Sequence, residues 1–381
     1  MSTIRWTESH TTDSTELSAR WHSENAAPPP RRIVIADDRM RAGTACRLAR
    51  EGTGLLWRGD FHNARQLLRA MGRRIDAKPV PAGTDPAQAF RLHRRTRARR
   101  AQVMGMLLVE LASDHSLALR RAPDVRRACA EAYGPSRESM VVSVSELLGV
   151  IGAHQWRLKG VRIPALGGAR IHPHYGVFSP VRGEYVDLVA QAPPPPATGA
   201  SRVAFDIGTG TGVFAAVLAR RGFHRIVATD DSPRALECAR DNVRRLNLGD
   251  GVEIEGPCLF PAEGRADLIV CNPPWLPGRP ATAIEHGVYD PGSAMLSGFL
   301  DGLAAHLTPG GQGWLILSDL AEHLELRTRG ELLAAIAAAG LHVTGRLDTR
   351  PRHPRASDPT DPFHTARAAE VTSLWCLEAR S

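Results

Sequence analysis

Short apolar runs alternate with segments of helical period in the second half of the chain. The apolar runs are predicted to be buried strands, because each is rich in β-branched or aromatic residues. These strands are expected at 202–208, 225–230, 252–256, 266–271, 313–319, 341–348 and 370–379. The segments between them are predicted to be helices, at 211–222, 232–248, 294–307 and 329–340. Gly222 is typical of a helix end, and Ser232 followed by proline is typical of a helix start.

This alternation predicts an α/β fold with a Rossmann-like, doubly wound and mainly parallel sheet of seven strands. The last two strands, with residues 349–369 between them, are predicted to form a long antiparallel hairpin at one edge. The sequence contains no visible internal repeat.

The first half of the chain is less regular. Residues 1–30 are polar, end in Ala-Ala-Pro-Pro-Pro and are predicted to be a flexible tail. Residues 31–165 are predicted to form a mostly helical N-terminal domain for substrate recognition, whereas 140–157 fit a strand or a helix equally. Its clearest elements are strands near 31–37 and 54–60 and a helix at 61–74. The Pro-, Ala- and Gly-rich residues 191–200 are predicted to be a linker.

Composition narrows the class of protein only slightly. The 381 residues are 43% hydrophobic, which suits a folded chain of two domains. The formal net charge of +8 permits a polyanionic partner without requiring one. The six cysteines form no CxxC pair and no zinc-like spacing, so free thiols and no metal site are expected. No signal segment and no apolar run of ~18 residues is visible, so a soluble cytoplasmic protein without membrane contact is predicted.

A glycine-rich turn joins the first strand of the alternating region to its helix. Gly208, Gly210 and Gly212 permit a sharp turn and close approach of a ligand, and the helix start behind them offers free N–H groups. Asp230 ends the second strand, where an acid binds the two hydroxyls of a ribose. With Asp206, these residues predict a nucleoside-binding site. The motif Gly-Thr-Gly-Val-Phe-Ala from Gly210 also fits the dinucleotide pattern, so an NAD-dependent dehydrogenase is an alternative.

The tetrapeptide Asn-Pro-Pro-Trp follows the strand at 266–271. Its prolines end the strand and hold a rigid loop. The side-chain oxygen of Asn272 and the carbonyl of Pro273 can each accept an N–H from a planar amine or amide. Suppose that the bound cofactor carries a methyl group on a positively charged sulfur. Two such bonds would then fix the acceptor nitrogen and favour its pyramidalisation as it attacks that methyl group. Trp275 offers a flat face on which a planar acceptor can stack.

Residues 206–212, Asp230 and residues 272–275 together resemble class I methyltransferases that use S-adenosylmethionine. The Asn-Pro-Pro-Trp loop resembles the subgroup that methylates planar nitrogens, which includes glutamine-N5, ribosomal RNA guanine-N2 and adenine-N6 enzymes. The resemblance covers about 170–381 and implies a seven-stranded methyltransferase sheet in a domain at 166–381.

The resemblance also implies site residues. Those expected to hold S-adenosylmethionine are Asp206, Gly208, Thr209, Gly210, Gly212, Asp230, Asp231, Cys258 and Asn272. Those expected to act on the acceptor are Asn272, Pro273 and Trp275. Phe178, Arg182 and Glu184 precede the glycine turn, where the subgroup folds a segment over its ligands, although an ordinary packed loop is an equal alternative. Cys258 stands where the family usually carries an acid near adenine, which leaves a backbone group or the thiol for that contact.

The acceptor is predicted to be RNA, particularly ribosomal RNA, or a protein glutamine. Six arginines in residues 91–100 could neutralise phosphates, although a solvated helix face is an alternative reading. Residues 350–355 add basic charge to the loop between the last two strands, which would meet a large substrate if it lies over the carboxyl ends of the strands. Asp319 is either a ligand contact or a helix cap. A small-molecule acceptor and a non-catalytic binding module are further alternatives, the latter motivated by Cys258.

Overall fold

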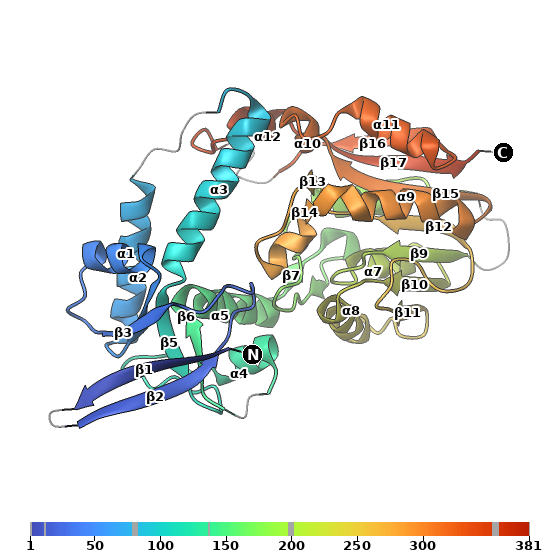
Figure 1. Cartoon of the computed structure of the whole chain (residues 1–381). Helices are drawn as coiled ribbons and strands as arrows, with labels where there is room; N and C mark the ends of the chain where they lie inside the picture. Colours follow the sequence, from blue (N-terminus) through green and yellow to red (C-terminus); the bar gives the residue numbers. More distant parts are fainter. Residues whose placement is uncertain are drawn as a thin grey trace. The chain divides into compact units, whose positions relative to one another are not determined.

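The structure is a computed structural model that describes residues 2–10, 13–77, 83–135, 138–196, 202–352 and 358–380. The chain forms two compact units, Met1–Gln155 and Trp156–Ser381 (Figure 1). The boundary therefore falls before the one predicted at residue 165.

A six-stranded mixed sheet organises the N-terminal unit, in the order β1-β2-β6-β5-β4-β3. Its strands are Thr3–His10 (β1), Asp13–Trp21 (β2), Arg32–Ala36 (β3), Thr53–Trp57 (β4), Leu107–Leu111 (β5) and Met140–Ser143 (β6). Its helices are Ala42–Arg50 (α1), Phe61–Asp76 (α2), Pro86–Met104 (α3), Arg126–Tyr133 (α4) and Val144–Lys159 (α5), which runs across the boundary. α1 connects the parallel pair β3 and β4, and α2 with α3 connects the parallel pair β4 and β5.

The N-terminal unit has the predicted helical content and the strands predicted near 31–37 and 54–60, but a sheet of six strands organises it. Its central strands are short apolar runs, such as Leu55 and Leu56 of β4, both fully buried. Periodicity cannot separate such a run from a buried helix. Residues 140–157 hold β6 followed directly by α5, which explains why both readings fitted that stretch.

The prediction of a flexible tail at residues 1–30 is wrong, because β1 and β2 form an antiparallel hairpin that joins the sheet. Alternate residues of the hairpin point into the core, where Ile4, Trp6 and Ala19 pack with Leu56. The intervening positions are polar, so overall polarity masked a strand with one buried face.

The C-terminal unit holds a seven-stranded sheet in the order β11-β10-β9-β12-β15-β17-β16. Its strands are Val203–Ile207 (β9), Arg225–Thr229 (β10), Val252–Glu255 (β11), Ala266–Cys271 (β12), Leu307–Ser318 (β15), Leu341–Thr349 (β16) and Thr372–Ala379 (β17). The main helices are Glu184–Gln191 (α6), Val213–Arg220 (α7), Pro233–Arg245 (α8), Ala294–His306 (α9) and Arg329–Ala338 (α11). Smaller elements include β7 (Val161–Arg162), β8 (Arg170–Ile171), β13 (Leu276–Pro277), β14 (Tyr289–Asp290), α10 (Leu320–His323) and α12 (His364–Ala369).

This sheet confirms the predicted doubly wound, mainly parallel fold. β17 pairs antiparallel with both β15 and β16, so the predicted final hairpin exists, and its first strand, β16, forms the sheet edge.

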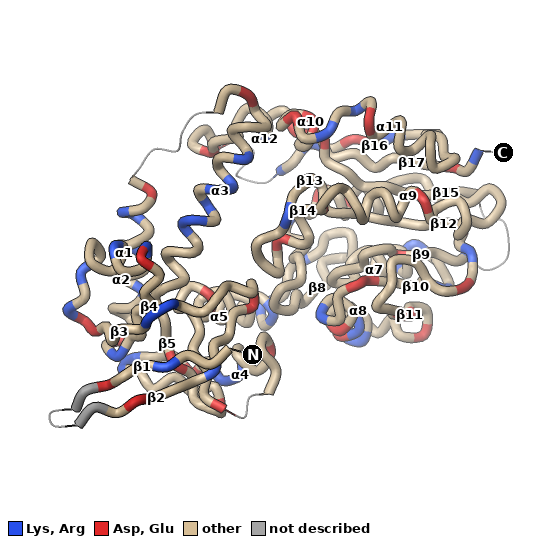
Figure 2. Tube along the Cα trace, viewed as in Figure 1, with Lys and Arg blue, Asp and Glu red and all other residues tan. Residues whose placement is uncertain are grey.

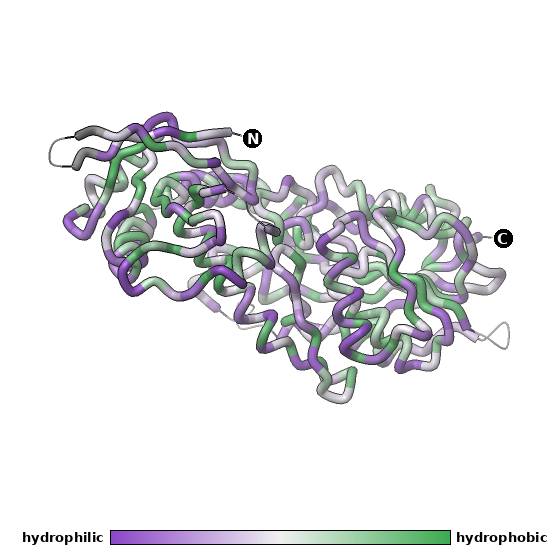
Figure 3. The backbone as a smooth tube through the Cα atoms, turned by 90° about the horizontal axis from the view of Figure 1, so that it is seen from below, coloured by the Kyte–Doolittle hydropathy of each residue, from purple (hydrophilic) through white to green (hydrophobic). Residues whose placement is uncertain are grey.

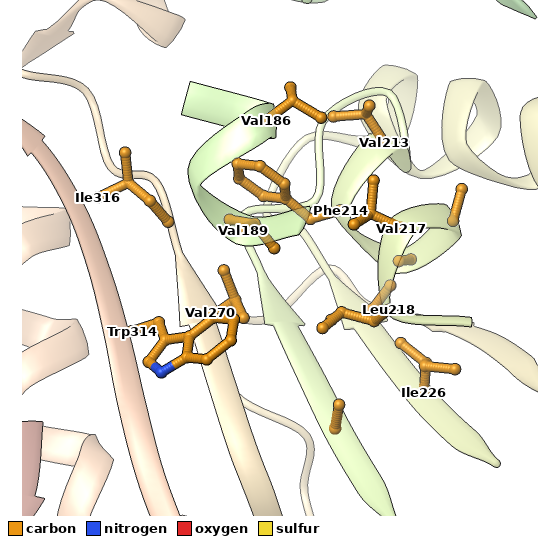
Figure 4. Close-up of a cluster of buried hydrophobic side chains, with 14 of the residues drawn as sticks. Val186, Val189, Val213, Phe214, Val217, Leu218, Ile226, Val270, Trp314 and Ile316 are labelled. Carbon is orange, nitrogen blue, oxygen red and sulfur yellow. The ribbon is translucent and has the colours of Figure 1, made fainter. Parts of the chain in front are cut away.

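Two apolar clusters cover the two faces of the seven-stranded sheet. Alternate residues of one strand enter different clusters, as Val270 and Ile269 of β12 do. On one face, side chains from α6 and α7 pack over the strands, with Phe214 near Val270 and Trp314 (Figure 4). On the other face, α9 and α11 cover the sheet. Figure 3 shows the resulting alternation of hydrophobic and hydrophilic stretches along the chain.

Candidate functional site

The glycine-rich turn follows β9 in a left-handed conformation that favours glycine. The φ angles of Gly208, Gly210 and Gly212 are +71°, +56° and +78°. A Cβ on Gly210 would have its nearest neighbour, the Gly208 carbonyl oxygen, 4.0 Å away, so that side of the turn is open. The N–H of Thr209 donates to the carbonyl of Thr229 at 2.8 Å and ties the turn to β10. The turn is therefore tied to β10 at Thr209 and open at Gly210.

Asp206 is a fully buried carboxyl group beneath this turn. Its Oδ2 accepts hydrogen bonds from Thr209 Oγ1 at 2.6 Å and from the N–H of Ala215 at 2.9 Å. Its Oδ1 is buried and has no hydrogen-bond partner among residues of the described ranges. Burial raises the pKa of Asp206 to about 7. The site thus contains a buried carboxylate oxygen that a cationic or N–H-bearing ligand group could satisfy.

Asp230 ends β10 beside the same turn. Its Oδ2 accepts from the N–H of Gly210 and its Oδ1 from the N–H of Ser232, each at 2.9 Å. Burial, with a smaller contribution from neighbouring Asp231, raises the pKa of Asp230 to about 6 despite these bonds. Each carboxylate oxygen has a second lone pair, so the two hydroxyls of a ribose could still bind. Asp231 itself is exposed to solvent.

Cys258 lies beside Asp230 in the loop after β11. Its N–H donates to the main-chain carbonyl of Asp230 at 3.1 Å, and its thiol is half-buried. Burial raises the pKa of the Cys258 thiol, with a further contribution from Glu255. A neutral thiol and main-chain groups therefore stand where an acid would be expected.

The register between β9 and β12 brings the glycine turn and the Asn-Pro-Pro-Trp loop together. These strands are parallel neighbours, and Cys271 at the end of β12 pairs with Ile207 at the end of β9. Asn272 and Gly208 are the residues that follow these two strands, so both loops begin side by side at the carboxyl ends of the strands. Ligand sites of open α/β sheets lie at this edge.

Trp275 holds the Asn272 side chain in one orientation. Its indole Nε1–H donates to Asn272 Oδ1 at 2.8 Å, which fixes the direction of the amide. The ring is half-buried against both apolar clusters and meets Tyr185 edge-on, with centroids 6.3 Å apart. The carbonyl of Pro273 accepts no hydrogen bond from any residue that the structure describes. The loop therefore keeps one lone pair on Asn272 and the Pro273 carbonyl for another molecule.

Helix α6 contributes a residue that no sequence motif marks. Tyr185 is buried and contacts the rings of both Phe214 and Trp275, whereas only its neighbours had been singled out. Of these, Glu184 is 4% exposed and has a buried Oε1 without a partner in the described part of the chain. A buried aromatic residue in a helix, such as Tyr185, carries no sequence signal that it will contact Trp275.

Phe178 and Arg182 fall in different environments. Phe178 is 36% exposed, whereas Arg182 lies 3.6 Å from the buried carboxylate of Glu370. Glu370 accepts a hydrogen bond from Ser318 Oγ at 2.7 Å, at the end of β15. Burial raises the pKa of Glu370.

Asp319 accepts a hydrogen bond from the N–H of Val371 at 2.7 Å and so joins two chain segments. It makes no side-chain cap of α10.

Three other predicted features are the basic stretch at 350–355, the linker at 191–200 and the arginines of 91–100. Arg352 lies 3.5 Å from Asp187, but residues 353–355 of the basic stretch lie outside the described residues. Residues 197–200 of the predicted linker do so too. The arginines of 91–100 lie in α3 of the N-terminal unit.

Two kinds of feature are absent from the ranges that the structure covers. No group of three or more His, Cys, Asp or Glu side chains there could hold a metal ion. No helix there is both long and apolar enough to cross a membrane.

Residues 169–327 match the family model of the methyltransferase small domain. The chain is 34% identical over 143 residues to ribosomal protein L11 methyltransferase of Pelotomaculum thermopropionicum, covering 37% of this chain and 39% of that protein. It is 37% identical over 155 residues to release factor glutamine methyltransferase of Deinococcus radiodurans, covering 38% and 52%. The chain thus spans about half the length of these relatives or less. A solved methyltransferase from Pyrococcus furiosus matches with 21% identity, 62% and 98% coverage and a TM-score of 0.40.

Proposed function

We propose that this chain, through its methyltransferase small domain, is an S-adenosylmethionine-dependent N-methyltransferase that acts on a planar amine or amide nitrogen. One observation carries the proposal. The pairing of Cys271 with Ile207 sets the Asn-Pro-Pro-Trp loop beside the glycine turn, so a cofactor loop and an acceptor loop share one sheet edge. The family match over 169–327 and the names of the relatives support the same activity.

The residues present fit S-adenosylmethionine. The orphaned Oδ1 of Asp206 suits the ammonium group of the methionine moiety, and the open side of Gly210 allows close approach of a ligand. Asp230 would accept hydrogen bonds from the ribose hydroxyls, and main-chain groups near Cys258 would face the adenine. When bound, the cofactor supplies a methyl group on a positively charged sulfur, which makes that carbon electrophilic.

The acceptor loop would prepare the nitrogen rather than deprotonate it with a strong base. Asn272 Oδ1 accepts one N–H of the acceptor while Trp275 holds the amide in place. The Pro273 carbonyl accepts the other N–H. Two acceptors fixed in this way turn the nitrogen lone pair toward the methyl group and stabilise the positive charge that develops on the nitrogen. Once the new N–C bond has replaced the S–C bond, the methylated nitrogen releases one proton to solvent. Trp275 also offers part of its face to the acceptor, although most of its ring packs against the core.

A macromolecular substrate in the cytoplasm is the setting we propose. The two named relatives are a ribosomal protein methyltransferase and a release factor methyltransferase, so large acceptors are usual for similar proteins. The N-terminal unit would then recognise the substrate, as an independent compact unit joined to the methyltransferase unit.

Cofactor binding separates this proposal from its alternatives. Titration calorimetry with S-adenosylhomocysteine should give binding to the wild type and much weaker binding to Asp230→Asn. An Asn63→Ala variant in the N-terminal unit serves as a matched control. Binding of NAD in its place would indicate the dehydrogenase, and binding of neither at millimolar concentration would favour the non-catalytic module suggested by Cys258.

A further inference from the structure

Almost all of the excess positive charge of this chain lies in one segment. Residues 1–155 contain 25 Arg and Lys against 16 Asp and Glu, a formal charge of +9. Residues 156–381 contain 23 against 24, a charge of −1. Within the N-terminal unit, residues 61–104 alone hold 11 against 2, which is again +9. The rest of that unit is neutral, so the excess reflects this segment and not a general arginine bias.

The segment places its arginines on the surface of two packed helices, α2 and α3. On α3, Arg91, Arg95 and Arg99 are exposed and follow at intervals of four residues, which puts them on one helix face about 6 Å apart along the axis. The opposite side packs Phe90 and Met104 into the unit. In Figure 2, basic positions recur along α3. We call the exposed arginines of residues 65–100 the α2–α3 basic surface.

Acidic residues do not neutralise this surface. α3 contains no Asp or Glu. Asp85 caps its start through the N–H of Gln88, and Asp76 forms a two-pronged pair with Arg100 at 2.7 and 3.0 Å. Arg95 and Arg99 make no ion pair with any residue in the described ranges. Like charges four residues apart destabilise an isolated helix, so this arrangement favours an external anion as the partner.

We propose that the α2–α3 basic surface binds the phosphate backbone of an RNA and delivers that RNA to the methyltransferase unit. Arginine binds phosphate oxygens through its planar set of N–H donors, and several in a row act together on a polyanion. The identification of the RNA as substrate rests on the proposed function, since an exocyclic base amine is a planar nitrogen of the required kind.

RNA fits this surface better than duplex DNA. The arginine row carries no interleaved aromatic residues for base stacking and no Asn or Gln among Arg91–Arg100 to read base edges. Such a surface holds a backbone by charge and shape. Structured RNA presents unpaired bases whose amines are already accessible, whereas a DNA base must first be flipped out of its duplex.

The test compares two full-length variants of equal charge. The first is Arg91→Gln/Arg95→Gln/Arg99→Gln. The control is Arg32→Gln/Arg39→Gln/Arg127→Gln, three exposed arginines of the same unit outside the surface. Binding of deproteinised ribosomal RNA and of a 24-base-pair DNA duplex is measured by filter retention at 50 to 300 mM KCl. We expect the first variant to bind RNA at least about tenfold more weakly and to lower the salt slope by ~2 to 3, with the control close to wild type.

Equal RNA affinities for the two variants would overturn the proposal, as would stronger retention of the DNA duplex than of RNA by the wild type. Circular dichroism of both variants checks that each is folded. Methyl transfer to RNA is measured separately with the wild type and with Asn272→Ala, which should lose most of it. RNA binding that depends on the arginines, without methylation of RNA by the wild type, would support the surface as an RNA-binding site and overturn RNA as the methyl acceptor. Methyl label in protein alone would overturn the RNA assignment.

Discussion

Replacing Asp206 with Asn should make the protein more stable at neutral pH and less able to bind its cofactor. The carboxyl group is fully buried, and one of its oxygens has no partner among the described residues. Burial raises its pKa from 3.8 to about 7. The folded state therefore favours the protonated form, and this stabilisation is fully present below pH 3.8 and is lost as the pH rises to about 7.

The magnitude follows from the size of that shift. A change of about three pKa units corresponds to about 4 kcal/mol between the two ends of this pH range. Asparagine keeps an oxygen for Thr209 and Ala215 but does not ionise. Its amide N–H₂ adds an unsatisfied donor that costs ~1–3 kcal/mol at every pH. The variant should thus be less stable than wild type near pH 4 and more stable by ~1–3 kcal/mol near pH 8.

Urea unfolding of the full-length proteins from pH 4 to pH 8 measures this difference. Because the amide cost is constant, the change in the difference between wild type and variant isolates the ionisation of Asp206. Parallel stability profiles for the two proteins would refute the reasoning. Calorimetry with S-adenosylhomocysteine should show ~10- to 150-fold weaker binding by the variant, as expected for a lost hydrogen bond to a charged group.

Three further predictions follow from the same contacts. Affinity for S-adenosylhomocysteine should fall as the pH drops from 8 to 5, because Asp230, with a pKa of about 6, and Asp206 become protonated; a flat calorimetric profile would contradict this. Trp275→Phe should lower kcat about tenfold with cofactor affinity unchanged, because it removes the 2.8 Å hydrogen bond to Asn272. Steady-state kinetics measure this change, and a kcat equal to that of the wild type would contradict it. Trp6→Ala should destabilise the N-terminal unit by ~3–5 kcal/mol in urea unfolding, whereas a flexible tail would lose nothing.

The sequence was sufficient to predict the seven-stranded sheet and its glycine turn. Central strands such as β12 are short apolar runs that are buried throughout, and Gly208, Gly210 and Gly212 adopt the positive φ that their motif requires. The N-terminal sheet was predicted only in part, at β3 and β4, because its strands are as short as four residues and because β1 and β2 bury only alternate side chains.

The candidate site was likewise predictable only where local sequence motifs mark its residues. Motifs identified Asp206, Asp230 and Asn272 because their chemistry is tied to local spacing. Tyr185 and the Ser318–Glu370 pair depend on contacts between distant segments, which no local pattern encodes. The bond from Trp275 to Asn272 likewise depends on the fold of the loop and not on residue type.

The central claim is that the Asn-Pro-Pro-Trp loop orients a nitrogen for methyl transfer. Its most direct test is the transfer of labelled methyl groups from S-adenosylmethionine into separated RNA, DNA and protein fractions of a host that lacks this protein. Wild type and Asn272→Ala are compared at matched occupancy by cofactor. We expect label in one fraction with the wild type, and loss of most of that label with Asn272→Ala while S-adenosylhomocysteine affinity stays within about threefold. Equal labelling by the two proteins would contradict it.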